Sequence, residues 1–181
     1  MNTRYRKFYS RPKVDVGFGN NVPTRPLPLE ENTTAVNIAP TDMRLVKEAL
    51  PESVDKSQKF WIYQIRYNPE SDWAPLYAFS EVEFLPQDFA VLNFGTSKLP
   101  SSWFTQRLVL VQHILDAAES DIEGLYIMAG KEVKVRTHGK TEVVQELKNE
   151  EDRVNALEKW FGIKLLDHEV TGIKGLGSEL R

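Results

Sequence analysis

The sequence lacks cysteine altogether and contains only three histidines. The absence of cysteine excludes disulfides, thiolate-bound zinc, iron–sulfur clusters and thiol catalysis within these 181 residues. Such a composition suits a reducing compartment or a virus particle, so we expect a cytoplasmic or virion location. The histidines show no metal-ligand spacing, and no glycine-rich motif precedes a helix, so we expect no metal and no cofactor.

Long apolar runs are also missing. The longest run, around residues 108–111, is broken by Gln112 and His113. It falls far short of the roughly 18–20 residues that span a bilayer. The sequence therefore predicts no membrane span and no membrane partner.

Charge is distributed unevenly along the chain. Residues 1–29 contain six basic residues and one acidic residue, a net charge of +5, whereas the whole chain carries −3, which leaves −8 on the remainder. Residues 1–40 show neither helical nor strand periodicity and contain five prolines, which fix φ and remove a hydrogen-bond donor. We therefore predict an extended basic arm over residues 1–40.

The rest of the chain predicts one α+β domain with short flanking segments. We expect a mainly antiparallel sheet of about five strands with two principal helices, preceded by the extended N-terminal arm; a mixed sheet is the alternative. The predicted divisions are a short helix and linker over residues 41–58, the globular domain over 59–167, and a flexible glycine-rich tail over 168–181.

The spacing of apolar residues places the individual elements. Helices are predicted over residues 42–50, 103–118 and 150–161, the last with Asn149 as its N-cap and Gly162 at its end. Strands are predicted over residues 59–67, 74–84, 89–94 and 141–147, and a hairpin over residues 125–136.

Asp121, Glu132 and Lys134 form the sharpest candidate catalytic set. The period of two places Glu132 and Lys134 on one face of a strand, where two carboxylates would hold Mg²⁺ and the lysine would position water or a phosphate. This pattern resembles the core of the PD-(D/E)xK nucleases, although Ser120 stands where that motif has proline. The resemblance implies a Mg²⁺-dependent nuclease. The competing interpretation is a solvent-facing strand with alternating charges, and no catalytic residue at all.

Cationic and aromatic residues alternate near the N-terminus. They could stack on bases and neutralise phosphates, or they could bind an acidic protein surface. The acidic remainder of the chain favours a protein partner, with nucleic acid as the alternative. The predicted partner-binding residues are Arg4, Tyr5, Arg6, Lys7, Phe8, Tyr9, Arg11, Lys13 and Phe18.

Three functional hypotheses follow. The leading one is a non-enzymatic assembly protein whose arm binds neighbouring protein subunits in a larger complex, such as a phage particle or a multisubunit machine. The second is the Mg²⁺-dependent nuclease. The third is a small inhibitor or immunity-type binding protein, whose acidic loop over residues 116–123 imitates nucleic acid or blocks a basic site.

Overall fold

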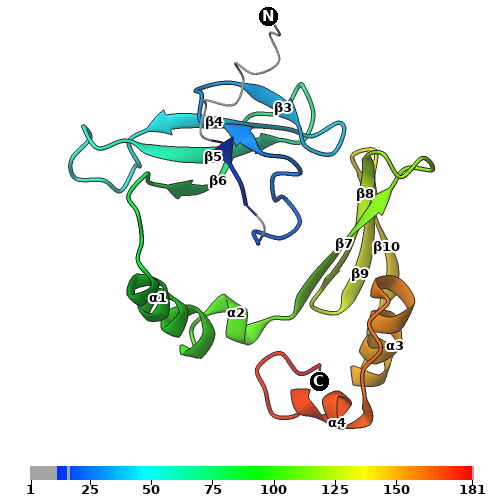
Figure 1. Cartoon of the computed structure of the whole chain (residues 1–181). Helices are drawn as coiled ribbons and strands as arrows, with labels where there is room; N and C mark the ends of the chain where they lie inside the picture. The colour runs from blue at the N-terminus through cyan, green and yellow to red at the C-terminus, as the bar shows by residue number, and fades with distance from the viewer. Residues whose placement is uncertain (1–11, 16, 181) are drawn as a thin grey trace, which may run out of the picture. The chain divides into compact units, whose positions relative to one another are not determined.

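The chain divides into two compact units, Met1–Glu81 and Val82–Arg181, which are taken separately below (Figure 1). The computed structural model describes residues 12–15 and 17–180. Among these residues, no helix combines the length and the apolar character that a membrane span requires.

The first unit is built from short antiparallel strands. A two-stranded ribbon pairs β1 (Pro12–Lys13) with β2 (Leu27–Pro28). A four-stranded sheet follows in the order β3-β4-β5-β6, with bounds Thr34–Val36, Asp42–Glu48, Phe60–Arg66 and Ala74–Phe79. The core that holds these elements together consists of Leu27, Met43, Leu45, Trp61, Tyr63 and Ile65.

Residues 42–48 form the strand β4, so the predicted helix over residues 42–50 is wrong. Met43 and Leu45, two positions apart, are both buried, while Arg44 between them stays partly exposed. That alternation is the period of a strand rather than of a helix. Full antiparallel pairing with β5 satisfies the backbone and decides the conformation, and β5 itself confirms the predicted strand over residues 59–67.

The second unit combines a four-stranded antiparallel sheet with helices. The sheet order is β10-β9-β8-β7, with bounds Val109–Leu115 for β7, Ile122–Ala129 for β8, Glu132–Thr137 for β9 and Lys140–Glu146 for β10. The helices are α1 (Pro86–Lys98), α2 (Trp103–Gln106), α3 (Glu150–Phe161) and α4 (Asp167–Val170), the last continued by a 3₁₀ turn over Thr171–Ile173.

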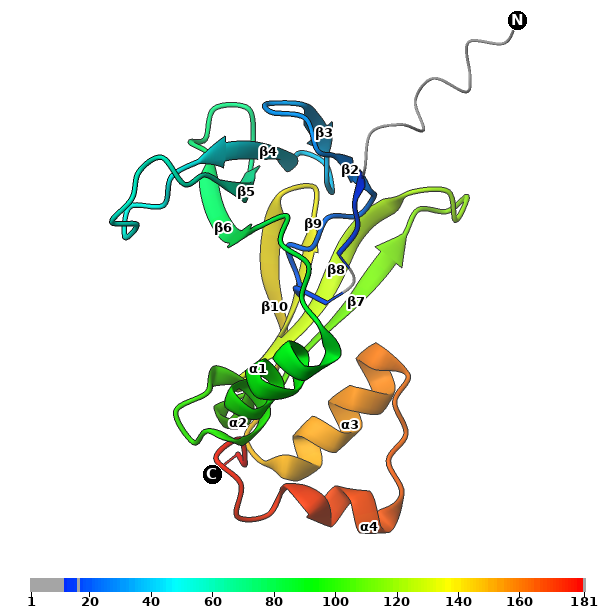
Figure 2. The same cartoon turned by 60° about the vertical axis from the view of Figure 1, so that its left-hand side comes forward.

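Helix α3 packs on this sheet and organises the core of the second unit. Ala156, Leu157 and Phe161 of α3 lie against Met128 and Val133 of the sheet. The C-terminal segment folds back on the same helix, where Arg153 Nη2 donates to the carbonyl of Ser178 at 2.9 Å and the Leu180 amide donates to Glu150 Oε1 at 2.6 Å (Figure 2).

The predictions for α3 and for the hairpin are confirmed. Asn149 caps α3, since its Oδ1 accepts the Asp152 amide at 2.9 Å, and Gly162 ends the helix with a φ of 66°. That left-handed conformation suits glycine, which has no Cβ to clash. Strands β8 and β9 form the predicted hairpin with Gly130 in its turn.

Two other predictions in the second unit are wrong, because a helix and a strand are exchanged. The predicted strand over residues 89–94 lies inside helix α1, which begins with Pro86 and is held by the Asp88 carboxylate accepting the Leu85 amide at 2.8 Å. The predicted helix over residues 103–118 contains only the short α2, followed by strand β7. Residues 109–115 are rich in branched apolar side chains, and their seven-residue pairing with β8 overrides the helical spacing.

The predicted fold class is therefore wrong. Among the described residues, the structure has three sheets of antiparallel strands in two units, not one sheet of about five strands carrying two helices. The described part of the predicted arm packs on the first unit, where Leu27 and Ile38 are buried. The predicted boundaries at residues 40, 58 and 167 stay a prediction about which segments fold independently.

Candidate functional site: a lysine–aspartate–tyrosine cluster

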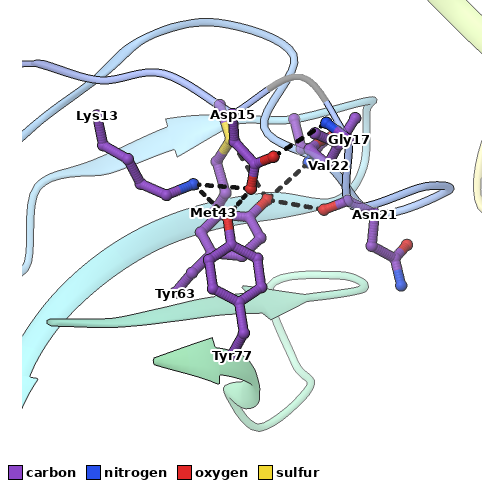
Figure 3. A network of polar contacts seen from close by, with 9 residues as sticks. Lys13, Asp15, Gly17, Asn21, Val22, Met43, Tyr63 and Tyr77 are labelled. Atoms are coloured by element: carbon purple, nitrogen blue, oxygen red, sulfur yellow. Dashed lines mark hydrogen bonds and ion pairs between the residues drawn. The ribbon is translucent and has the colours of Figure 1, made fainter. Parts of the chain in front are cut away.

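Asp15 lies just after β1, at the start of a turn in the first unit. Its Oδ1 accepts the backbone amide of Gly17 at 3.1 Å, which fixes the carboxylate relative to the chain (Figure 3). The side chain is about 20% exposed. A mostly buried carboxylate is costly unless hydrogen bonds and charges compensate for the lost water, so its partners are informative.

Lys13, Asp15 and Tyr77 form a closed polar triangle (Figure 3). Lys13 Nζ lies 3.1 Å from Asp15 Oδ2 and also donates to the hydroxyl of Tyr77. The Tyr77 hydroxyl in turn donates to the same Asp15 oxygen. Oδ2 therefore receives two donors and Oδ1 receives one. A carboxylate offers about four lone-pair sites, so Asp15 retains the capacity for a further hydrogen bond.

Aromatic rings surround the lysine of this cluster. Lys13 Nζ lies 4.7 Å from the ring centre of Tyr77, 5.1 Å from that of Tyr63 and 5.6 Å from that of Phe79. Ring faces are negative and attract cations, more strongly when water is excluded. The Lys13 side chain is only 9% exposed, so the rings and Asp15 together replace its hydration.

A second set of hydrogen bonds holds the hydroxyl of Tyr63, next to this cluster. The Tyr63 hydroxyl donates to the carbonyl of Asn21 at 3.0 Å and accepts from Asn37 Nδ2 at 3.1 Å. Asn37 Nδ2 also donates to the carbonyl of Val22 at 3.0 Å. These bonds tie the loop that follows Asp15 to the core strand β5. Tyr63 and Asn37 are buried, so their hydrogen bonds are shielded from competing water.

The surroundings shift the ionisation of each member. Burial acts to raise the pKa of Asp15, but the hydrogen bonds from Tyr77, Gly17 and Lys13 outweigh it and hold that pKa below its usual value. Burial lowers the pKa of Lys13 despite the opposing effect of Asp15. Burial also raises the pKa of Tyr63 to about 12, and burial together with Asp15 raises the pKa of Tyr77. Asp15 is thus an ionised acceptor beside two neutral hydroxyls.

This arrangement can orient and polarise a neighbouring donor. An ionised carboxylate held by fixed donors is the kind of group that aligns a histidine or stabilises its charged form during proton transfer. The sequence prediction had treated Asp15 only as the single acid of a basic arm. The available signal in the sequence was an acidic residue two positions after Lys13 and two positions before Gly17.

The predicted catalytic set is not brought together. Asp121 precedes β8 and lies in a turn with Asp116, while Glu132 begins β9 at the other end of the hairpin. Eight strand residues separate those ends, about 25 Å at the usual rise. Glu132 and Lys134 do share a face and form an ion pair of 2.7 Å. In the part of the chain that the structure describes, no three acidic or histidine side chains are grouped to hold a metal ion.

The predicted partner-binding residues divide into two groups. Lys13 belongs to the cluster, and the Phe18 ring lies 4.5 Å from that of Tyr77 while remaining 42% exposed. The others lie outside the described residues, so their predicted role stays a prediction: Arg4, Tyr5, Arg6, Lys7, Phe8, Tyr9 and Arg11.

Comparison with known proteins identifies the family of this chain. The family model described as N-acetyltransferase matches residues 13–170, a range that includes Lys13, Asp15 and Tyr77. The chain therefore belongs to the N-acetyltransferase family.

Individual relatives agree with that assignment. The chain is 34% identical to the N-malonyltransferase FDB2 of Fusarium pseudograminearum, over 88% of this chain and 49% of that protein. Its structure resembles the arylamine N-acetyltransferase of Mycobacterium marinum in complex with CoA, at 26% identity and a TM-score of 0.67, covering 86% of this chain and 50% of that one. The Mycobacterium abscessus enzyme shares the fold, at 20% identity and a TM-score of 0.73, over 90% and 53% of the two chains. The chain thus spans about half the length of these relatives.

These findings overturn the functional hypotheses drawn from the sequence. The chain belongs to the N-acetyltransferase family and resembles a protein named as an enzyme, so the non-enzymatic assembly protein and its virion context are wrong. The Mg²⁺-dependent nuclease and the small inhibitor are wrong for the same reason. The expected protein subunits of a larger assembly, with nucleic acid as the alternative, are wrong as well, because the matched relatives are named as enzymes, one of them described in complex with CoA.

Proposed function

We propose that the chain forms part of an N-acyltransferase, which moves an acyl group from a CoA thioester to the nitrogen of an amine. The observation that carries this proposal is the match to the family over residues 13–170, supported by the 34% identity to an N-malonyltransferase. The cytoplasmic location expected from the composition stays a prediction.

The reaction sets clear demands on the protein. The carbon–sulfur bond of the thioester breaks, a carbon–nitrogen bond forms, the amine loses a proton and the CoA sulfur gains one. A base must accept the amine proton, and its orientation controls the rate. The chain contains no cysteine, so a cysteine nucleophile for a covalent acyl intermediate would come from outside these 181 residues.

Asp15 is the group of this chain that we assign to that chemistry. Its low pKa keeps it ionised, and the donors of Lys13, Tyr77 and Gly17 hold it in one orientation. With one acceptor position left, it would align a base and stabilise that base when protonated. Lys13 and Tyr77 would act as positioning residues, since they reach the reaction only through Asp15.

The acyl donor proposed first is malonyl-CoA. The relatives named N-malonyltransferase are 32–34% identical to this chain, whereas the solved arylamine N-acetyltransferases are 20–27% identical. Acetyl-CoA is the second donor, and an arylamine is the acceptor that the names of the solved relatives suggest.

A chimaeric enzyme tests the proposal, because it supplies the half of the relative's length that this chain does not match. Residues 13–170 of this chain replace the matching segment of the Fusarium pseudograminearum enzyme, and CoA release is followed with malonyl-CoA or acetyl-CoA and an arylamine. We expect acyl transfer, with malonyl-CoA preferred. Asp15→Asn should lower kcat by roughly 100-fold or more, in the range of a lost proton-transfer group.

The matched control is Asp121→Asn, an exposed carboxylate in the other unit that should leave kcat unchanged. A folded chimaera without acyl transfer from either donor would contradict the proposed function. Equal effects of the Asp15 and Asp121 substitutions would contradict the assignment of Asp15.

A further inference from the structure

Residues 82–108, here named the α1–α2 segment, contain the helices α1 and α2 (Figure 2). Their side chains leave an unusual amount of apolar surface exposed. No residue of helix α1 is buried. The segment holds eleven of the 21 large hydrophobic side chains found exposed in the described part of the chain. They are Val82, Phe84, Leu85, Phe89, Val91, Leu92, Phe94, Leu99, Trp103, Phe104 and Leu108.

The segment carries few charged residues for a stretch that faces solvent. Its charged residues are Glu83, Asp88, Lys98 and Arg107, which sum to zero. The apolar side chains of α1 occupy several sides of the helix rather than one stripe. A helix that is hydrophobic around most of its circumference is normally buried, and patches of this kind mark protein contacts.

The shape of the segment is nevertheless defined by its own hydrogen bonds. Ser102 Oγ donates to the carbonyl of Thr96 at 2.6 Å, Thr105 Oγ1 donates to that of Leu99 at 3.0 Å, and Gln106 Nε2 donates to that of Pro100 at 2.6 Å. These bonds hold α2 against the end of α1. An isolated helix of this length is marginal in water, so the segment needs packing from elsewhere to be stable.

We propose that the α1–α2 segment is a docking face. The polypeptide that docks there is the half of an N-acyltransferase to which no part of this chain aligns. The inference rests on the proposed function. The chain spans 49% of the Fusarium pseudograminearum enzyme and 50% of the Mycobacterium marinum enzyme. About half of each relative therefore lies outside the match, and an uncovered, nearly uncharged apolar face is what such a half would cover. The contact lies within one acyltransferase and does not make the chain a subunit of a larger assembly.

The occupant is a polypeptide with a matching apolar, weakly charged surface. A charged partner is disfavoured, because burying charges against Phe89, Leu92 and Phe94 would remove their hydration without offering a counter-charge. The exposed aromatic side chains Trp103 and Phe104, stacked edge to face with centroids 5.3 Å apart, are of the residue types that anchor protein interfaces.

Co-expression tests the docking face directly. The whole 181-residue chain is produced with the portion of the Fusarium pseudograminearum enzyme that it does not match, supplied as a separate tagged polypeptide. We expect the two to co-purify in equal amounts. Leu92→Glu and Phe94→Glu should each weaken the complex by roughly tenfold or more, measured by titration.

Two control variants carry the same change at exposed apolar positions away from the face. Val54→Glu lies in a loop of the first unit, and Val143→Glu lies on β10 of the second. Both should bind like the wild type. Circular dichroism of every variant separates lost binding from lost folding.

Four results would overturn the docking face, of which the first three come from the binding measurements. These three are failure of the wild-type chain to bind the supplied half, binding that Leu92→Glu and Phe94→Glu leave unchanged, and self-association of the chain through the same residues. Slow hydrogen exchange throughout α1 in the monomeric chain alone would also overturn it, since the face would then be covered already. Because binding is measured without catalysis, a complex that forms but transfers no acyl group contradicts the proposed function and leaves the docking face supported.

Discussion

Helices α1 and α3 lie in the same unit, have almost the same length and contain the same number of apolar residues, yet only one of them is packed. Each has five apolar residues, in 13 positions for α1 and 12 for α3. In α3 they recur three and four positions apart, and Ala156, Leu157 and Phe161 are buried. In α1 four of them are consecutive, from Phe89 to Leu92, and none is buried.

The difference shows that the arrangement of apolar residues, and not their number, determines what a helix can do alone. A stripe lets α3 cover the sheet and leave its charged residues in water. Consecutive apolar residues point in all directions, so one sheet could never cover α1. Substitutions in the packed core should therefore lower the free energy of unfolding of the chain alone. Substitutions in the α1–α2 segment should have a large effect only on binding to a partner.

The largest effect is expected at Leu157, which is 6% exposed in the core of the second unit. Leu157→Ala leaves a cavity between α3 and the sheet, and should lower the free energy of unfolding of this unit by about 2–5 kcal/mol. Native-state hydrogen exchange of the sheet amides measures it. Leu176→Ala, at a position 52% exposed, is the control. An equal loss of unfolding free energy there would contradict the contrast between packed and exposed positions.

The next largest effect is expected at Tyr63 in the first unit. Tyr63→Phe removes the hydroxyl that donates to the Asn21 carbonyl and accepts from Asn37. Losing these two hydrogen bonds, one of them to the buried Asn37, should cost about 1–3 kcal/mol of unfolding free energy, read from urea denaturation. Tyr67→Phe, at a position 47% exposed, should be nearly neutral. A similar loss in both variants would show that the hydroxyl network adds no stability.

A pH-dependent effect is expected from Asp15. Its pKa in the folded unit lies below the usual value of 3.8, so the ionised carboxylate stabilises the fold above that pH. The stabilisation is lost as the pH falls through the lower, folded pKa. Urea midpoints between pH 6 and pH 2 should therefore fall more steeply for the wild type than for Asp15→Asn. Parallel pH profiles would contradict the depressed pKa.

The smallest effect is expected in the α1–α2 segment. Leu92 is 56% exposed, so Leu92→Ala should change the unfolding free energy of the chain by no more than about 0.5 kcal/mol. The same hydrogen-exchange measurement used for Leu157 provides the value. A loss comparable to that of Leu157→Ala would mean that α1 is packed within the chain, and the contrast between the two helices would disappear.

Several elements could be predicted from the sequence because their signals are local. The cap at Asn149, the stop at Gly162 and the stripe between them define α3 without reference to the rest of the chain. The strand over residues 60–66 and the hairpin around Gly130 are similar cases, since branched and aromatic residues next to a glycine turn suit few other conformations.

Other elements could not be predicted because neighbouring segments decide them. Residues 42–48 and 109–115 have apolar spacings that fit a helix as well as a strand, and pairing with β5 and β8 settles the outcome. The candidate site was missed for a related reason. Lys13 and Asp15 are separated from Tyr77 by more than 60 positions, and only the folding of β6 beside β5 brings Tyr77 to them.

The sequence by itself determined the absence of a cysteine nucleophile, the cap and stripe of α3, and the apolar character of the α1–α2 segment, because each depends on residue types at fixed local spacing. Only the tertiary structure decided which segments are strands, placed Asp15 among Lys13, Tyr77 and Gly17, and showed that the apolar side chains of α1 stay uncovered. Those properties depend on contacts between residues far apart in the chain, where the free energy of pairing and burial outweighs local preference.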